Sequence, residues 1–206
     1  MKQRQPPSRD RSQRFENYLE HLTGAAGHAD RIIPMENYTK GLMLPLERKS
    51  VEPMAARLAP GNVRQMHQSL HHIVADAAWS DAALLREVRE QVLPAMTRRH
   101  QLLAWIVDDT RFPKKGTHSV GVTRQYCGQV GKQDNCRIAV SVSLATEQAS
   151  LPVRYQLYLP ENWAEDREGR KKAGVPEEIR FQTKPGIALD HGKCLAPAVW
   201  TSLMSA

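Results

Sequence analysis

The spacing of hydrophobic residues divides the chain into a first part with a helical pattern and a later part with a strand pattern. Before residue 100, apolar side chains recur at every third or fourth position, which gives each segment one apolar face along a helix. The segments that follow this rule are residues 15–22, 51–58, 63–77 and 84–96. Beyond residue 100 the apolar residues occur in short runs or in alternation, which favours strands.

Three segments of the later part are predicted to be strands. Residues 102–107 form a short apolar run that is followed directly by Asp108 and Asp109, and we expect the strand to end there. Residues 137–145 and 153–159 carry apolar side chains at alternate positions, the pattern of a strand with one buried face. In this order the strands suit an antiparallel meander, with the glycine-containing segment after the first strand forming a hairpin or a loop.

These patterns define four parts of the chain. Residues 1–14 are polar, basic and proline-bearing, and we expect a flexible arm. Residues 15–99 are predicted to be a helical region, and residues 100–190 to be a region built around the strands. Residues 191–206 receive no structural assignment.

The composition is that of a basic, globular protein. With 206 residues, 41% hydrophobic and 25% charged, the chain is long enough for one or two domains and is not broadly disordered. A net charge of +7 favours a polyanionic partner, the alternative being a basic soluble protein without one. Three cysteines without a CxxC pair support neither a zinc site nor a disulfide framework. We interpret the cysteines as reduced thiols and expect a cytoplasmic protein. No apolar run is long enough to span a membrane.

The two adjacent acids are the first candidates for chemistry. Successive residues of a strand point to opposite faces, so Asp108 shares a face with Thr110, and Asp109 shares the other with Arg111. One carboxylate can then bind an ion while the other pairs with a cation or meets water. The alternative is structural, because an Asp-Asp-Thr sequence is a common opening of a turn.

Long segments of the chain resemble bacterial insertion-sequence transposases. The likeness is carried by DDTRFPKKGTHSVGVTRQYCGQVGKQDNCRIAVSVSLA, LPVRYQLYLPENWAEDREGRKKAGVP and FQTKPGIALD, and earlier by YTKGLMLPLERKSVEPMAARL and SLHHIVADAAWSDAALLREV. It covers residues 37–190, whereas residues 191–206 do not resemble the family. The resemblance implies a DDE-type transposase and an α+β fold, in which the helical region precedes the first strands of an incomplete, RNase H-like mixed sheet.

The resemblance also implies a metal site. In the family, an Asp on the first strand, a second Asp on a later strand and a Glu on a helix hold two divalent cations during phosphodiester displacement. The first Asp matches Asp108, which is therefore the candidate catalytic residue and metal ligand, with Asp109 as the alternative if the register is shifted by one. Oxygen ligands suit Mg²⁺ or Mn²⁺. No residue of this chain matches the second Asp or the Glu.

DNA is the partner that the same resemblance implies, namely double-stranded DNA at the ends of an insertion sequence. The candidates for contacting its phosphates are Lys114, Lys115, Arg124 and Lys132. The helical region is a further candidate for DNA binding, unless it only packs on the catalytic region. A bacterial, nucleoid-associated location and a second copy or an intact transposase as protein partner are expected as well.

The missing ligands shape the functional prediction. We expect a truncated DDE transposase that binds DNA but does not transfer strands alone. The alternative is a non-catalytic DNA-binding or interaction protein that modulates an intact transposase, and in that case Asp108 is structural. An unrelated metal-dependent nuclease is a third interpretation, for which no sufficient set of ligands is present.

Overall fold

The chain folds into two compact units that share a helix. The computed structural model describes residues 8–204, and the units meet between Gln91 and Val92, inside α5 (Asp81–Thr97). The hydrophobic pattern placed the change from helical to strand-containing structure after residue 99. The periodicity of α5 does not break where one unit passes into the other, so the sequence gives no sign of the boundary.

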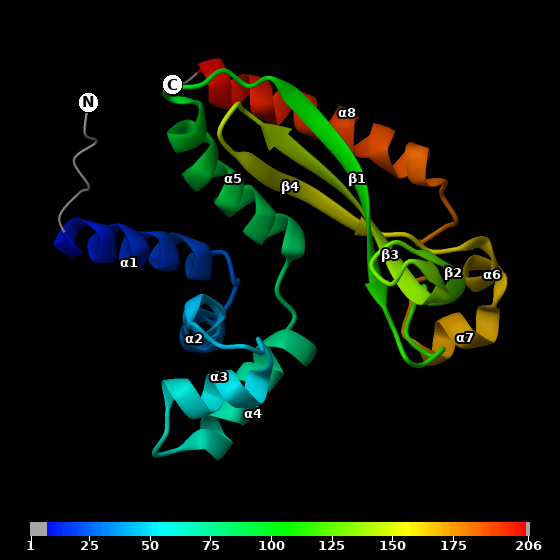
Figure 1. The fold of residues 1–206 in the computed structure, drawn as a ribbon, viewed down its shortest axis with the longest axis horizontal. Coiled ribbons are helices and arrows are strands. Elements are labelled where there is room, and N and C mark those ends of the chain that lie inside the picture. The colour runs from blue at the N-terminus through cyan, green and yellow to red at the C-terminus, as the bar shows by residue number, and fades with distance from the viewer. Residues whose placement is uncertain (1–7, 205–206) are drawn as a thin grey trace. The chain divides into compact units, whose positions relative to one another are not determined.

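The first unit is helical throughout its described residues (Figure 1). Its elements are α1 (Ser8–Gly24), η1 (Ala29–Arg31), α2 (Ile32–Met43), α3 (Val51–Leu58), α4 (Val63–Ala75) and the first part of α5. The four segments with a helical pattern are confirmed as helices. Residues 8–14, expected in a flexible arm, instead begin α1, where Asp10 and Arg14 lie one turn apart and form an ion pair at 4.0 Å. Residues 1–7 of that arm lie outside the described residues.

Two small apolar clusters hold the helices of this unit together. The first consists of Ala26, Met35 and Ile73, and the second of Met54, Ala55 and Leu70. Tyr38 of α2 packs against both clusters. Each large side chain that is removed from water in this way stabilises the unit by roughly 2 kcal/mol.

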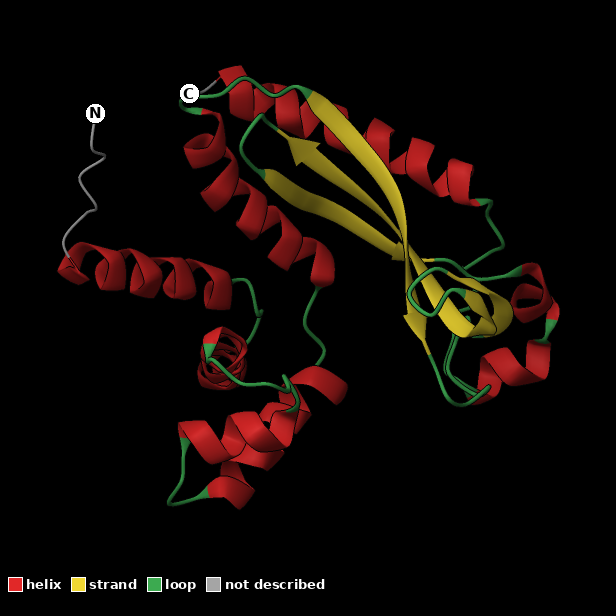
Figure 2. Ribbon diagram, viewed as in Figure 1, coloured by secondary structure: helices red, strands yellow, loops and turns green. Residues whose placement is uncertain are grey.

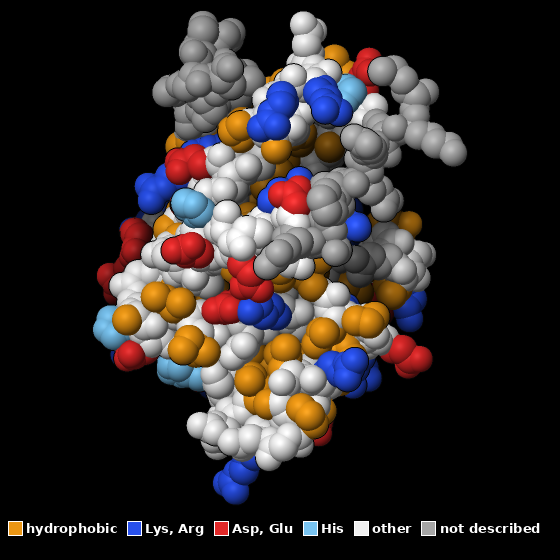
Figure 3. Space-filling view, turned by 90° about the vertical axis from the view of Figure 1, so that its left-hand side faces the viewer, with side chains coloured by type: hydrophobic (Ala, Val, Ile, Leu, Met, Phe, Trp, Pro, Cys, Tyr) orange, Lys and Arg blue, Asp and Glu red, His pale blue; other side chains and the backbone are white. Residues whose placement is uncertain are grey.

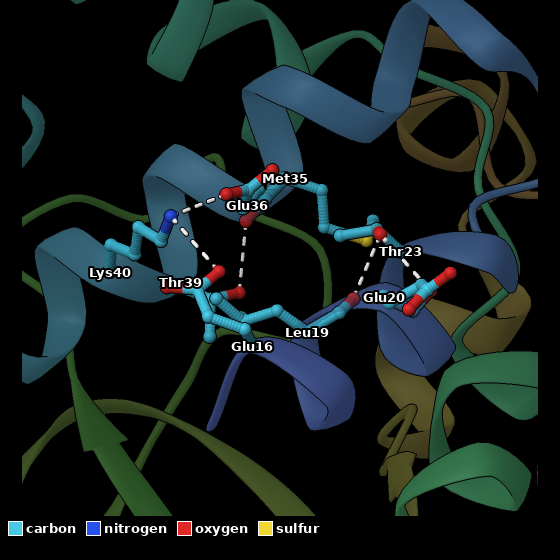
Figure 4. A network of polar contacts seen from close by, with 8 residues as sticks. All are labelled: Glu16, Leu19, Glu20, Thr23, Met35, Glu36, Thr39 and Lys40. Carbon is cyan, nitrogen blue, oxygen red and sulfur yellow. Dashed lines mark hydrogen bonds and ion pairs between the residues drawn. The ribbon is translucent and has the colours of Figure 1, made fainter. Parts of the chain in front are cut away.

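Polar contacts join α1 to α2 beside these clusters (Figure 4). Lys40 of α2 forms ion pairs with Glu36 of its own helix and with Glu16 of α1, the latter at 3.6 Å. The hydrogen bond with Glu36 raises the pKa of Lys40, which keeps its ammonium group charged. On α1, the buried hydroxyl of Thr23 donates to the carbonyl of Leu19 at 2.8 Å. The ion pair between Lys40 and Glu16 therefore adds a polar link between α1 and α2.

The second unit contains a four-stranded antiparallel sheet built around one long strand (Figure 2). This strand, β3 (Lys132–Ala145), pairs with β1 (Ala104–Pro113), β2 (Thr123–Cys127) and β4 (Ser150–Leu157). The antiparallel arrangement predicted for three strands is confirmed, and the glycine-containing segment supplies β2 as a hairpin partner of β3. Among the described residues, β1 pairs only with β3, so its other edge carries no strand.

Alternation along β3 places the core of this unit on one face of the sheet. The buried side chains of the strand are Ile138, Val140, Val142 and Leu144, as the sequence pattern predicted. Helix α8 (Lys184–Met204) packs on β3 with Ile187 and Leu195 buried. Residues paired across strands share a face, so the odd-numbered residues of β1, such as Val107 opposite Val142, lie on this α8 face.

One expectation about this unit was wrong, and one segment without an assignment proved helical. The first strand does not end at Asp108 and Asp109, because β1 continues to Pro113 and every residue of the extension pairs with β3. That pairing outweighs the turn preference of the Asp-Asp-Thr sequence. Residues 191–204, which received no assignment, continue α8.

Between β4 and α8 lie two short helices, α6 (Glu161–Glu165) and α7 (Arg167–Lys172). No helix in the described part of the chain is long and apolar enough to cross a membrane.

Candidate functional site

The two adjacent aspartates lie in the middle of β1, a strand with one open edge. Asp108 is paired opposite Ser141, and Asp109 opposite Val140. Asp108 is exposed, whereas Asp109 is half-buried on the α8 face. The expected division of the two carboxylates between opposite faces is confirmed, and it gives them different surroundings.

Two cations hold the carboxylate of Asp109. Arg111 places Nη1 at 2.7 Å from Oδ1 and Nη2 at 3.1 Å from Oδ2. Lys184, the first residue of α8, donates from Nζ to Oδ2 at 2.8 Å. The side chains of all three residues are about 30% exposed, between 28% and 31%. This cluster therefore fastens the start of α8 to β1.

The carboxylate of Asp108 is not engaged in this way. Within the described residues it forms no ion pair, and only its backbone carbonyl accepts a bond, from the hydroxyl of Ser141 at 3.5 Å. A cation from solution can reach Asp108 without displacing a protein group. For Asp109, Arg111 and Lys184 would first have to move.

An open cavity of about 990 Å³ lies between β1 and α8. Both aspartates border it, and α8 contributes Lys184 and Lys193 to its rim. The remaining wall is largely apolar and includes Val107 of β1 and Leu189 of α8, which are 56% and 66% exposed. The cavity thus combines the carboxylate of Asp109, ammonium groups and an exposed apolar wall beside a free strand edge.

The described residues do not make up a complete divalent-metal site. They contain no group of three or more His, Cys, Asp or Glu side chains that could hold a metal ion together. Mg²⁺ takes six ligands in near-ideal octahedral geometry, of which one carboxylate of β1 supplies a small share. Asp108 therefore fits as one ligand, and a site for two cations requires carboxylates beyond this set.

The four predicted DNA-contacting residues are not all brought together. The backbone N–H of Lys114 donates to the carbonyl of Asn135 at 2.8 Å, and Arg124 is paired opposite the same Asn135. Lys114 and Arg124 therefore flank one residue of β3. Lys115 is exposed just beyond β1. Lys132 belongs to the other face of β3, where its Nζ lies 3.7 Å from a carboxylate oxygen of Asp134.

Sequence reasoning missed three residues around this site. Arg111 was placed on the same strand face as Asp109 but was not recognised as its partner, although the spacing of two residues carries that signal. Lys184 is 75 residues from Asp109 in the sequence, and only the packing of α8 on the sheet brings it there. Lys193 follows two turns later on the same helix and gave no separate signal.

His191 of α8 is buried in the second unit and was also missed. Burial lowers its pKa, and the nearby charge of Arg154 lowers it further, while a hydrogen bond with the backbone of Val140 and the charge of Asp190 act in the opposite direction. Its Nε2 has no hydrogen-bond partner among the described residues. The imidazole is therefore neutral at pH 7.

Comparison with known proteins gives a family match over most of the chain. A family model described as "DDE superfamily endonuclease" matches residues 17–201, which extends through most of α8 and past the expected limit at residue 190. The chain is similar to the "Probable transposase for insertion sequence element IS701" of Microchaete diplosiphon, with 32% identity over 149 residues, 72% of this chain. It spans about a third of that curated relative, 34% of its length. No solved structure matches.

Proposed function

Because the chain belongs to the DDE superfamily endonucleases, we propose that it acts in DNA transposition by binding double-stranded DNA at the ends of an insertion sequence. The family match over residues 17–201 carries this proposal, since it includes both units and the strand with Asp108 and Asp109. The relative from Microchaete diplosiphon, named a probable transposase, supports the same function.

The charge of the chain supports DNA as the partner. The net charge is +7, and the proposed phosphate contacts are Lys114, Lys115, Arg124 and Lys132. Lys114 and Arg124 flank Asn135, so one approaching backbone can meet both. Lys132 contributes less, because Asp134 already neutralises part of its charge.

Asp108 is the proposed first ligand of a divalent cation, Mg²⁺ or Mn²⁺, with Asp109 as the alternative. The exposure of Asp108 and its freedom from cationic partners among the described residues support this choice. Asp109 has a positioning role, in which Arg111 and Lys184 hold α8 against β1. When bound by a full set of ligands, the ion activates the attacking oxygen and stabilises the leaving one.

Alone, the chain is proposed to bind DNA without cutting it, because the described residues supply one metal ligand and no complete site. A chain of this kind can also modulate an intact transposase by occupying its DNA ends or its contacts with a second copy. That second function is favoured by the open edge of β1 and the apolar cavity wall, which offer a surface to another polypeptide.

DNA binding is tested by measuring the affinity of the full chain for a duplex at several salt concentrations. We expect affinity to fall steeply with salt, because bound cationic side chains release counterions from the duplex. The double variant Lys114→Ala, Arg124→Ala should bind more weakly and lower the slope of log affinity against log salt by about 2. A flat salt response of the unmodified chain would reject phosphate-led binding.

Catalysis is tested by incubating supercoiled plasmid with the chain and Mg²⁺. We expect no nicking, and Asp108→Asn should bind DNA as tightly as the parent or tighter, because a negative charge is removed. Nicking that disappears in Asp108→Asn would contradict the proposed inactivity and support the ligand assignment. Nicking that disappears only in Asp109→Asn would favour the alternative ligand.

A further inference from the structure

The first part of β3 and all of β2 form a two-stranded ribbon at one end of the sheet. β2 pairs with residues 132–136 of β3, while β1 and β4 pair with later residues of that strand. Arg124 lies opposite Asn135, and Tyr126 opposite Gln133, so these four side chains share one face. We call them the ribbon face. Tyr126 is 56% exposed there, so its ring is accessible to a ligand.

The opposite side of the ribbon is fixed to the rest of the unit. Cys127 and Cys136 are fully buried, and the side-chain amide of Gln125 donates to the carbonyl of Cys136 at 3.2 Å. At the tip, the amides of Val130 and Gly131 both donate to the carbonyl of Cys127, at 3.1 Å and 2.9 Å. Gly131 has a φ of +66°, a conformation that favours glycine. The ribbon face is therefore presented on a supported backbone.

The root of the ribbon is fastened as well. The indole N–H of Trp163 in α6 donates to the carbonyl of Val122, just before β2, at 2.8 Å. Gly121 has a φ of +74°, and a Cβ at this position would lie 2.9 Å from the carbonyl oxygen of Tyr158. Any larger residue at position 121 would push β2 away from the segment after β4.

Positive charge is concentrated around this ribbon. The segment from residue 112 to residue 137 contains five cationic side chains and one acidic one, a net charge of +4. The cationic residues are Lys114, Lys115, Arg124, Lys132 and Arg137, and the acid is Asp134. A polyanion is the occupant that such a surface attracts.

We propose that the ribbon face enters a groove of double-stranded DNA and that Tyr126 and Gln133 contact base edges there. The inference rests on the proposed function and adds specificity to it. The major groove of B-DNA admits a two-stranded ribbon, glutamine amides can pair with adenine, and aromatic rings pack on thymine methyl groups. Arg124 and the neighbouring Lys114 then meet the phosphates on the groove wall.

The test begins with selection of preferred duplexes from a randomised pool by the full chain. Affinities are then measured for the best duplex and for a scrambled one. Tyr126→Ala and Gln133→Ala should each lower the ratio of the two affinities by about tenfold, because a base contact is lost. The affinity for the scrambled duplex and its salt slope should stay unchanged, because neither side chain is charged. Arg124→Ala should weaken both duplexes equally and lower the slope by about 1.

Tyr155→Ala is the matched control, since Tyr155 of β4 is a tyrosine of similar exposure, 43%, outside the ribbon. It should leave the ratio unchanged. The inference is overturned if no duplex is preferred, if the ratio survives both Tyr126→Ala and Gln133→Ala, or if an RNA duplex binds as tightly as DNA. Salt-dependent binding in those cases would leave the proposed function standing. If the parent chain binds no DNA at all, both the proposed function and the inference about the ribbon face are overturned.

Discussion

The helical unit and the sheet unit differ in where they leave apolar side chains exposed. In the helical unit four of the five large apolar residues with high exposure lie on α2, namely Ile32, Ile33, Leu42 and Met43, and the fifth is Val74 on α4. In the sheet unit the largest group lies on or beside β1: Leu103, Trp105, Ile106, Val107 and Phe112, each between 38% and 60% exposed, while others, such as Tyr155 and Leu189, lie on β4 and α8. On the face drawn in Figure 3, basic and acidic side chains (blue and red) are mixed with hydrophobic ones (orange). Within the described residues of the sheet unit, more exposed large apolar residues lie on or beside β1 than on any other element.

Backbone geometry shows which groups of β1 are left at its open edge. The N–H of Lys114 donates to Asn135 of β3, so in antiparallel pairing the even-numbered residues of β1 point their backbone groups at β3. The N–H and C=O groups of Trp105, Val107, Asp109 and Arg111 then point to the open edge. Helices bond most of their backbone groups internally, whereas β1, like β4 on the other side of β3, keeps one ladder of donors and acceptors unused within the described residues.

Two valines paired across strands give the sharpest test of this difference. Val142 of β3 is 1% exposed, whereas Val107 opposite it on β1 is 56% exposed. Val142→Lys should destabilise the sheet unit by about 4 kcal/mol or more, because a charge is buried without a partner. Val107→Lys should change the unfolding free energy by less than about 0.5 kcal/mol. Urea denaturation of both variants, followed by circular dichroism, checks the contrast, and equal losses would contradict it.

The closed packing of the helical unit predicts the next largest effect. Leu70 of α4 is fully buried in the second apolar cluster, so Leu70→Ala should cost about 3 kcal/mol of unfolding free energy. Val74, one turn later on the same helix, is 48% exposed, and Val74→Ala should stay within about 0.5 kcal/mol. Thermal denaturation followed by circular dichroism at 222 nm compares the stabilities of Leu70→Ala and Val74→Ala. A small effect at Leu70 would show that this cluster is loosely packed.

The ion pairs at the start of α8 predict a moderate effect. Lys184→Met keeps the length of the side chain but removes its charge from Asp109, and should cost about 1 kcal/mol. Lys193→Met is the control, because Lys193 is 78% exposed and lies 3.7 Å from Asp190. Its stability should match that of the parent. The loss in Lys184→Met should shrink when Asp109→Asn is present, which a double-mutant cycle measures.

The smallest predicted effect is a pH dependence of the sheet unit. The folded state lowers the pKa of His191, so the unfolded chain takes up this proton first as the pH falls. The contribution of His191 to the free energy of unfolding is complete above the ordinary histidine pKa of about 6.5. It decreases as the pH falls below that value, and it stops changing once the pH is below the pKa of the folded state. Melting temperatures between pH 5 and 8 measure this. His191→Gln should remove that part of the dependence, and an unaltered profile would exclude His191 as its source.

The sequence predicted the elements that alternate or repeat regularly and missed those that depend on distant pairing. The buried face of β3 follows from Ile138, Val140, Val142 and Leu144, because alternation is a local property. The continuation of β1 past Asp109 could not be predicted, since it depends on pairing with residues 136–139. The length of α8 was hidden by the glycines and prolines in its sequence, which are poor helix formers.

The same limit applies to the candidate site. Alternation along a strand was enough to place Asp108 and Asp109 on opposite faces. It could not show which carboxylate is exposed, because that depends on Lys184 arriving from a helix far along the chain. The assignment of Asp108 as metal ligand and the DNA contacts of the basic residues stay predictions.

The doublet of aspartates on β1 has a consequence for insertions and deletions. A slip of the strand by one residue turns every side chain to the opposite face. A slip that moves Asp108 into the place of Asp109 would keep a carboxylate next to Lys184, although Arg111 would turn away and Val107 would take the place of Asp108. A single aspartate at position 109 would leave Lys184 without a carboxylate after the same slip. The second acid therefore preserves one contact, the ion pair with Lys184, through a shift that a single aspartate would not survive.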